Sequence, residues 1–105
     1  MNYDKVIETL KKSDKIKKML EYKEFRRIAE GITNEIPDYC EEVILSGERL
    51  ESYERSLPCF YTDDQVKVII DRIRDLGFST YVTGESQNRI VSIDLRQVSR
   101  QVLGV

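Results

Sequence analysis

The chain of 105 residues contains no histidine, no tryptophan and only two cysteines. Without histidine, the Ser-His and Cys-His pairs of nucleophilic catalysis are excluded, and a Cys/His zinc site cannot be completed within one chain. Cys40 and Cys59 are too few for a disulfide framework, so we expect two thiols that pack as small buried side chains. A single disulfide between them is the alternative that the sequence leaves open.

The remaining candidate chemistry rests on two pairs of adjacent carboxylates, Glu41-Glu42 and Asp63-Asp64. Neighbouring residues of a helix point about 100° apart, so neither pair presents both carboxylates to one metal or substrate. The five glycines are scattered and form no phosphate-binding loop. We therefore predict a protein that is not an enzyme and has no catalytic, metal or cofactor site.

A long apolar run is also missing, since no stretch approaches the ~20 residues needed to cross a bilayer. The start of the chain, residues 1–5, lacks the basic-then-apolar order of a secretion signal. With 40% apolar and 34% charged residues, the composition is that of one globular domain over residues 1–105. These features predict a cytoplasmic protein without a membrane partner.

Charge is unevenly distributed, although the formal net charge is only −2. Residues 1–30 hold nine Lys/Arg and six Asp/Glu, whereas residues 31–65 hold two and nine. Residues 66–88 balance at three each, and residues 89–105 hold three and one. The chain is therefore basic at both ends and acidic in the middle, a pattern that can favour self-association or orient a partner.

Helical spacing of apolar residues dominates the first half of the chain. It predicts a helix over 3–12, a break near Ser13 and a second helical stretch that ends around Gly31. A connection at 33–37 leads into a short helix from Tyr39, and helical spacing resumes over 50–57. Whether one helix kinked at Gly47 or two short helices fill this acidic region is left open.

The signals agree best over residues 60–95. Thr62 and Gln65 form a capping box for a helix over 63–76, and Gly77 supplies its stop. Alternating residues at 78–83 and 89–95, joined by a polar turn, predict an antiparallel hairpin whose apolar face packs on that helix. The apolar positions within residues 97–103 predict a short final helix. The fold class is therefore α+β, with a helical N-terminal half, then a helix, an antiparallel β-hairpin and a short C-terminal helix.

The order Thr62-Asp-Asp-Gln65, an isoleucine-rich helix, Leu76-Gly77-Phe78 and a hairpin ending in Ile90-Val-Ser-Ile93 resembles the C-terminal part of small tailed-bacteriophage proteins. The resemblance covers about a third of the chain. It implies a phage-encoded protein that is virion-associated or binds a host protein, located in the host cytoplasm or the virion. The resemblance identifies no functional residue in this chain.

Protein interaction or assembly is the function that these features favour, with self-association or another protein as the partner. The candidate contact residues are four lysines of the N-terminal region, one tyrosine of the hairpin and three apolar residues near the C-terminus: Lys11, Lys12, Lys15, Lys18, Tyr81, Val98, Val102 and Leu103. The alternative is a nucleic-acid-binding regulator that uses residues 63–76 and 78–95 as a winged-helix-like unit. Asp63, Asp64, Asp71 and Asp75 disfavour it, because they would repel phosphates.

Overall fold

The computed structural model describes residues 2–85 and 87–104 and confirms the α+β class. Its elements are α1 (Tyr3–Lys11), α2 (Asp14–Asn34), α3 (Ile36–Leu45), β1 (Ser52–Ser56), α4 (Asp63–Asp75), β2 (Thr80–Thr83), β3 (Ile90–Asp94) and α5 (Arg96–Leu103). The molecule is elongated, with principal extents of 65 × 31 × 21 Å.

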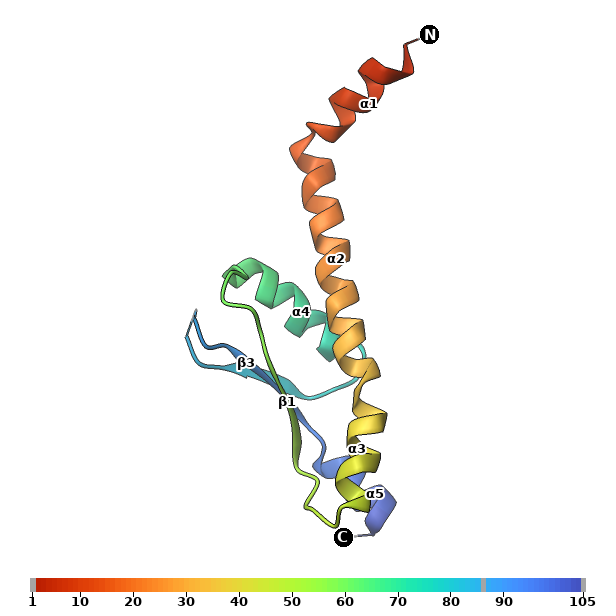
Figure 1. Cartoon of the computed structure of the whole chain (residues 1–105), viewed down its shortest axis with the longest axis vertical. Coiled ribbons are helices and arrows are strands. Elements are labelled where there is room, and N and C mark those ends of the chain that lie inside the picture. The colour runs from red at the N-terminus through yellow and green to blue at the C-terminus, as the bar shows by residue number, and fades with distance from the viewer. Residues whose placement is uncertain (1, 86, 105) are drawn as a thin grey trace.

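Helices α1, α2 and α3 follow one another along the long axis and form a rod, with α4 and the sheet on one side of it (Figure 1). The predicted break at Ser13 is confirmed, because the Ser13 hydroxyl accepts a hydrogen bond from the Ile16 N–H at the start of α2. The predicted end at Gly31 is wrong, since α2 runs on to Asn34. A single residue, Glu35, then joins α2 to α3, and Pro37 stands in the first turn of α3.

The region after Gly47 is the main correction to the predicted fold. Residues 52–56 form β1 rather than a helix, and β1 is a third strand of the sheet. Tyr53 and Leu57 are four residues apart, a spacing that puts two side chains on one face in a helix and in a strand alike. The apolar spacing was therefore ambiguous, and pairing with β3 decided it.

The sheet has the order β1-β3-β2, with β3 antiparallel to both neighbours. Strands β1 and β2 are consequently parallel to each other, and α4 connects them across β3 as a split β-α-β unit. The predicted hairpin of β2 and β3 is confirmed, with Tyr81 opposite Ser92 and Val82 opposite Val91.

The capping signals of α4 are confirmed. The Thr62 hydroxyl accepts from the Gln65 N–H, and the Gln65 side chain accepts from the Thr62 N–H. At the other end, Gly77 has φ +97°, a conformation that favours glycine and turns the chain towards β2.

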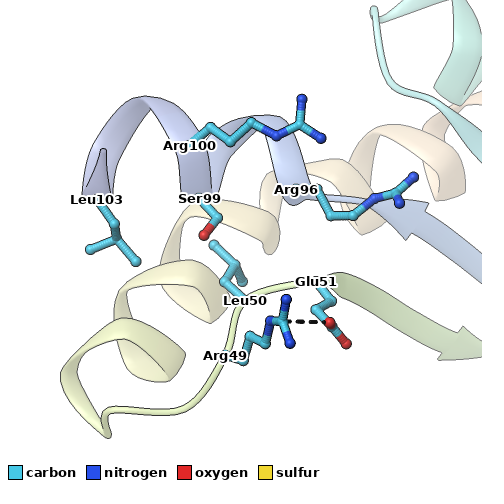
Figure 2. A pocket seen from close by; sticks show the side chains of 7 residues that line it. All are labelled: Arg49, Leu50, Glu51, Arg96, Ser99, Arg100 and Leu103. Carbon is cyan, nitrogen blue, oxygen red and sulfur yellow. Dashed lines mark ion pairs between the residues drawn. The ribbon is translucent and has the colours of Figure 1, made fainter. Parts of the chain in front are cut away.

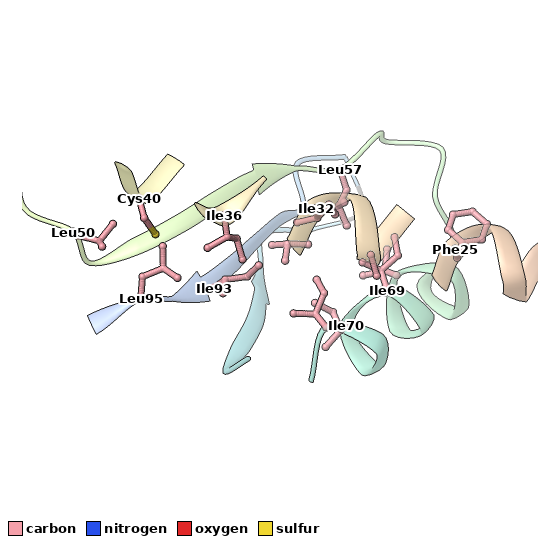
Figure 3. Close-up of a cluster of buried hydrophobic side chains, with 14 of the residues drawn as sticks. Phe25, Ile32, Ile36, Cys40, Leu50, Leu57, Ile69, Ile70, Ile93 and Leu95 are labelled. Atoms are coloured by element: carbon pink, nitrogen blue, oxygen red, sulfur yellow. The ribbon is translucent and has the colours of Figure 1, made fainter. Parts of the chain in front are cut away.

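The core lies between one face of the sheet and the helices α2, α3 and α4 (Figure 3). Helix α4 contributes Ile69 and Ile73, and β3 contributes Val91 and Ile93, all fully buried. Helix α2 packs along α4, and the rod continues this apolar face through α3. The core thus extends from α2 to the end of β3. The β2–β3 hairpin packs on α4, as the sequence predicted.

Candidate interaction surface

The N-terminal end of the rod projects beyond the core. We call residues 3–20, which comprise α1 and the first turns of α2, the arm (Figure 1). Phe25 is the first buried side chain along the described part of the chain, and it packs edge-on against Tyr61. None of the side chains of residues 3–20 is therefore buried in the core.

Apolar side chains are exposed along the arm. Tyr3, Val6, Ile7 and Leu10 of α1 are 47–66% exposed, and none of the residues 3–11, all of them described, is buried. A helix of nine residues is marginal in water without packing on its apolar face. Helix α1 is consequently an element that needs a covering partner.

The arm is also basic. Residues 11–18 carry five lysines and one aspartate, and the predicted contact residues Lys11, Lys12, Lys15 and Lys18 are all exposed there. The arm therefore offers an amphipathic helix, α1, followed by a positively charged segment.

Acidic residues gather at the opposite end of the rod. Residues 28–48 hold six Asp/Glu and no Lys/Arg. Two of the six form ion pairs with arginines. Glu30 pairs with Arg72 at 2.8 Å, and Glu35 pairs with Arg55. Helix α3 contributes a further exposed set of three carboxylates to this end: Asp38, Glu41 and Glu42.

The Glu35 pairing fixes the rod to the sheet. The Glu35 carboxylate accepts from the Arg55 guanidinium and the Tyr53 hydroxyl, and these two contacts hold the pKa of Glu35 below its usual value. Desolvation and the bond to Glu35 raise the pKa of the Tyr53 hydroxyl. The Tyr39 hydroxyl of α3 donates to the Ser52 carbonyl at 3.0 Å, so the rod and β1 are joined at two points.

The other predicted contact residues lie far from the lysines. Val102 and Leu103 on α5 are exposed, while Val98 is half-buried against the core. Tyr81 is exposed on β2, paired with Ser92 of β3. The structure therefore separates the predicted residues into an arm set, a sheet residue and a C-terminal set at the other end of the molecule (Figure 1).

A hollow of about 310 Å³ lies between α5 and the segment that leads into β1 (Figure 2). Arg49 pairs with Glu51 at 3.3 Å, and Arg96 pairs with Asp94 at 2.8 Å. Hydrogen bonds from the Arg96 side chain and its backbone N–H lower the pKa of Asp94 to about 2. In Figure 2 the side chains of Arg96 and Arg100 extend away from Arg49, so the three cations do not converge on one ligand.

The two cysteines are free thiols with different surroundings. Cys40 is buried, as expected, and desolvation raises its pKa. Cys59 is exposed, so the prediction that it is buried is wrong. It follows Pro58 in the loop between β1 and α4, which leaves the core after Leu57.

Residues 2–85 and 87–104 contain no group of three or more Cys, Asp or Glu side chains placed to hold a metal ion. Within the same described ranges, no helix has both the length and the apolar character needed to cross a bilayer.

Sequence reasoning detected the acidic middle of the chain but not where its charges lie. The spacing of Asp38, Glu41 and Glu42 could have revealed the acidic face of α3, because residues three and four positions apart lie on one side of a helix.

No protein-family model, curated protein or solved structure matches the chain.

Proposed function

We propose that the chain is a non-enzymatic protein-interaction or assembly factor that binds its partner through the arm. One observation carries the proposal: α1 is helical, yet its four large apolar side chains are exposed and none of its residues 3–11 is buried. Exposed apolar surface of this kind marks an interaction site. The resemblance to phage proteins adds a setting, either the virion or a complex with a host protein.

The nucleic-acid alternative rests on the lysines of the arm. Phosphate contacts by such lysines would give binding that falls steeply with salt. The winged-helix-like variant has less support, because Asp64, Asp71 and Asp75 are exposed on α4 and would repel phosphates. The apolar residues between the charges of α1 favour a protein partner.

The test compares a double substitution in the arm with a single control substitution, both in the full chain. Val6→Glu with Leu10→Glu places charge on the apolar face of α1 and should abolish capture of protein partners from a host extract. Leu45→Glu on α3 is the control, since Leu45 is an exposed apolar residue outside the arm, and should leave capture unchanged. Equal capture by native chain and arm variant would overturn the proposal.

Fluorescence polarisation with labelled DNA and RNA tests the nucleic-acid-binding alternative. Replacing Lys11, Lys15 and Lys18 by glutamate should leave the signal unchanged if the arm serves protein binding. Salt-sensitive nucleic-acid binding that is lost in this variant and kept in the Val6/Leu10 variant would establish the alternative instead.

A further inference from the structure

We propose that the arm is a helical hairpin that opens and closes: α1 swings back about Lys12 and Ser13 and packs antiparallel on the first turns of α2. The structure shows the open state, in which α1 continues the line of the rod (Figure 1). The inference rests on the proposed function, because closure regulates the same face of α1 that binds the partner. It is carried by a second apolar patch, by the spacing of the apolar residues and by the connection between the helices.

The second apolar patch lies at the start of α2. We call it the α2 patch, and it consists of Ile16, Met19 and Leu20, of which Met19 and Leu20 are exposed and Ile16 is half-buried. Ile16 lies nine residues before Phe25, and Leu20 lies nine residues before Ala29. Nine residues rotate a helix by about 900°, which is half a turn beyond two full turns. Because Phe25 and Ala29 are buried in the core, the α2 patch faces the side of the rod that α4 and the sheet leave free.

The apolar residues of α1 have the spacing that this patch requires. They lie within an arc of about 100°, and we call them the α1 face: Tyr3, Val6, Ile7 and Leu10. When α1 folds back, Leu10 lies opposite Ile16, because each is three residues from Ser13. Val6 and Ile7 lie seven and six residues before Ser13, and the other two members of the α2 patch lie six and seven residues after it. Closure therefore covers both apolar surfaces at once.

The connection between the two helices allows this geometry. Helical dihedral angles are interrupted at Ser13, whose ψ is 119°, so the path of the chain depends on Lys12 and Ser13 alone. The three steps from Lys11 to Asp14 span up to about 10 Å when extended, and packed helices have axes about 8–10 Å apart. Antiparallel helices joined by so short a loop are the helical counterpart of the β-hairpin.

Helix α1 also has the length and the charge to lie on α2. Its nine residues extend about 14 Å, which covers α2 from Asp14 to Lys23. Residues 3–11 hold two lysines and two carboxylates, so α1 has no net charge and the lysines at 15–18 do not repel it. Closure thereby buries apolar surface that a helix of this length otherwise leaves in water.

Closure and partner binding exclude each other. Both use the α1 face, and side chains that pack on the α2 patch cannot contact another protein. A partner that binds α1 therefore shifts the arm to the open state. Closure in turn weakens the apparent affinity in proportion to the fraction of chains that are open.

Distances between spin labels measure closure in the full chain. The labels are attached at Asp4→Cys and Glu24→Cys, two exposed positions outside both apolar surfaces, and Cys59→Ser removes the exposed native thiol. In the open rod the two positions are 20 residues, or about 25–30 Å, apart. Closure brings them within about 20 Å, because Asp4 then lies level with Tyr22. Pulsed EPR should resolve both populations, and a single distribution at the longer distance would refute closure.

Disulfide trapping tests the contact itself. Ile7→Cys and Leu20→Cys lie about 20 Å apart in the open rod, whereas a disulfide needs Cα atoms within about 7 Å of each other. The matched control pairs Ile7→Cys with Lys18→Cys, because Lys18 lies on the side of α2 that borders Phe25 and α4. With Cys59→Ser in both chains, oxidation should link the first pair at least about tenfold faster than the control. Equal rates would overturn the inference.

Leu20→Glu tests the regulation. It places a charge in the α2 patch and leaves α1 unaltered, so it should abolish the short distance and raise capture of protein from the host extract by about twofold or more. Leu45→Glu, the same change at an exposed leucine of α3, should alter neither. An opened arm without increased capture would refute the regulation.

The two readouts also separate this inference from the function on which it rests. A chain that shows only the long distance, yet captures a protein through Val6 and Leu10, refutes closure and preserves the interaction function. A chain that closes yet captures no protein confirms the hairpin and refutes the interaction function.

Discussion

Replacing Ile73 by alanine tests whether α4 is packed as the structure describes. Ile73 is fully buried on α4, where it belongs to the hydrophobic core. Truncation of a buried isoleucine to alanine removes the transfer free energy of its methyl and methylene groups and leaves a cavity, at a cost of about 2–5 kcal/mol. A loss of about 3 kcal/mol lowers the Tm by roughly 12–24 °C in a domain of this size.

Ile7→Ala is the matched control. It makes the same chemical change in a helix, so the gain in helix propensity cancels between the two variants. Ile7 is 47% exposed, and its truncation should change the free energy of unfolding by no more than about 0.5 kcal/mol. Thermal and urea unfolding would measure both. Equal losses in the two variants would refute the buried position of Ile73.

Three shorter predictions concern the cap, an ion pair and the thiols. Thr62→Ala removes the acceptor of the capping box and should cost about 1 kcal/mol of unfolding free energy in urea titrations; no change would contradict the cap. Asp94, whose pKa is lowered to about 2 by Arg96, should stabilise the fold above about pH 4. That contribution should be lost as the pH falls through about 2, and carbon-detected NMR of its carboxyl would reveal an ordinary pKa if the pairing is absent. Cys59 should react with a thiol reagent at once, and Cys40 only on unfolding, because Cys40 is buried; equal rates would count against this difference.

The elements that local chemistry specifies were predictable from the sequence. The capping box at Thr62, the glycine stop at Gly77 and the period-two alternation around Val91 each lie within a few residues of the structure they determine. The break at Ser13 belongs to the same class, since its hydroxyl caps the helix that follows it.

The tertiary structure decided what depends on distant residues. Tyr53 and Leu57 fit a helix or a strand equally well, and only pairing with β3, 34–42 residues later in the chain, made 52–56 a strand. Likewise, the sequence showed that residues 1–30 are basic and residues 31–65 acidic, but not that the lysines of residues 11–18 and the carboxylates of α3 lie towards opposite ends of one rod. The order of residues determines hydrogen bonds and side-chain periodicity within an element. Which faces remain uncovered is determined only when the elements pack, because burial depends on contacts between segments far apart in the chain.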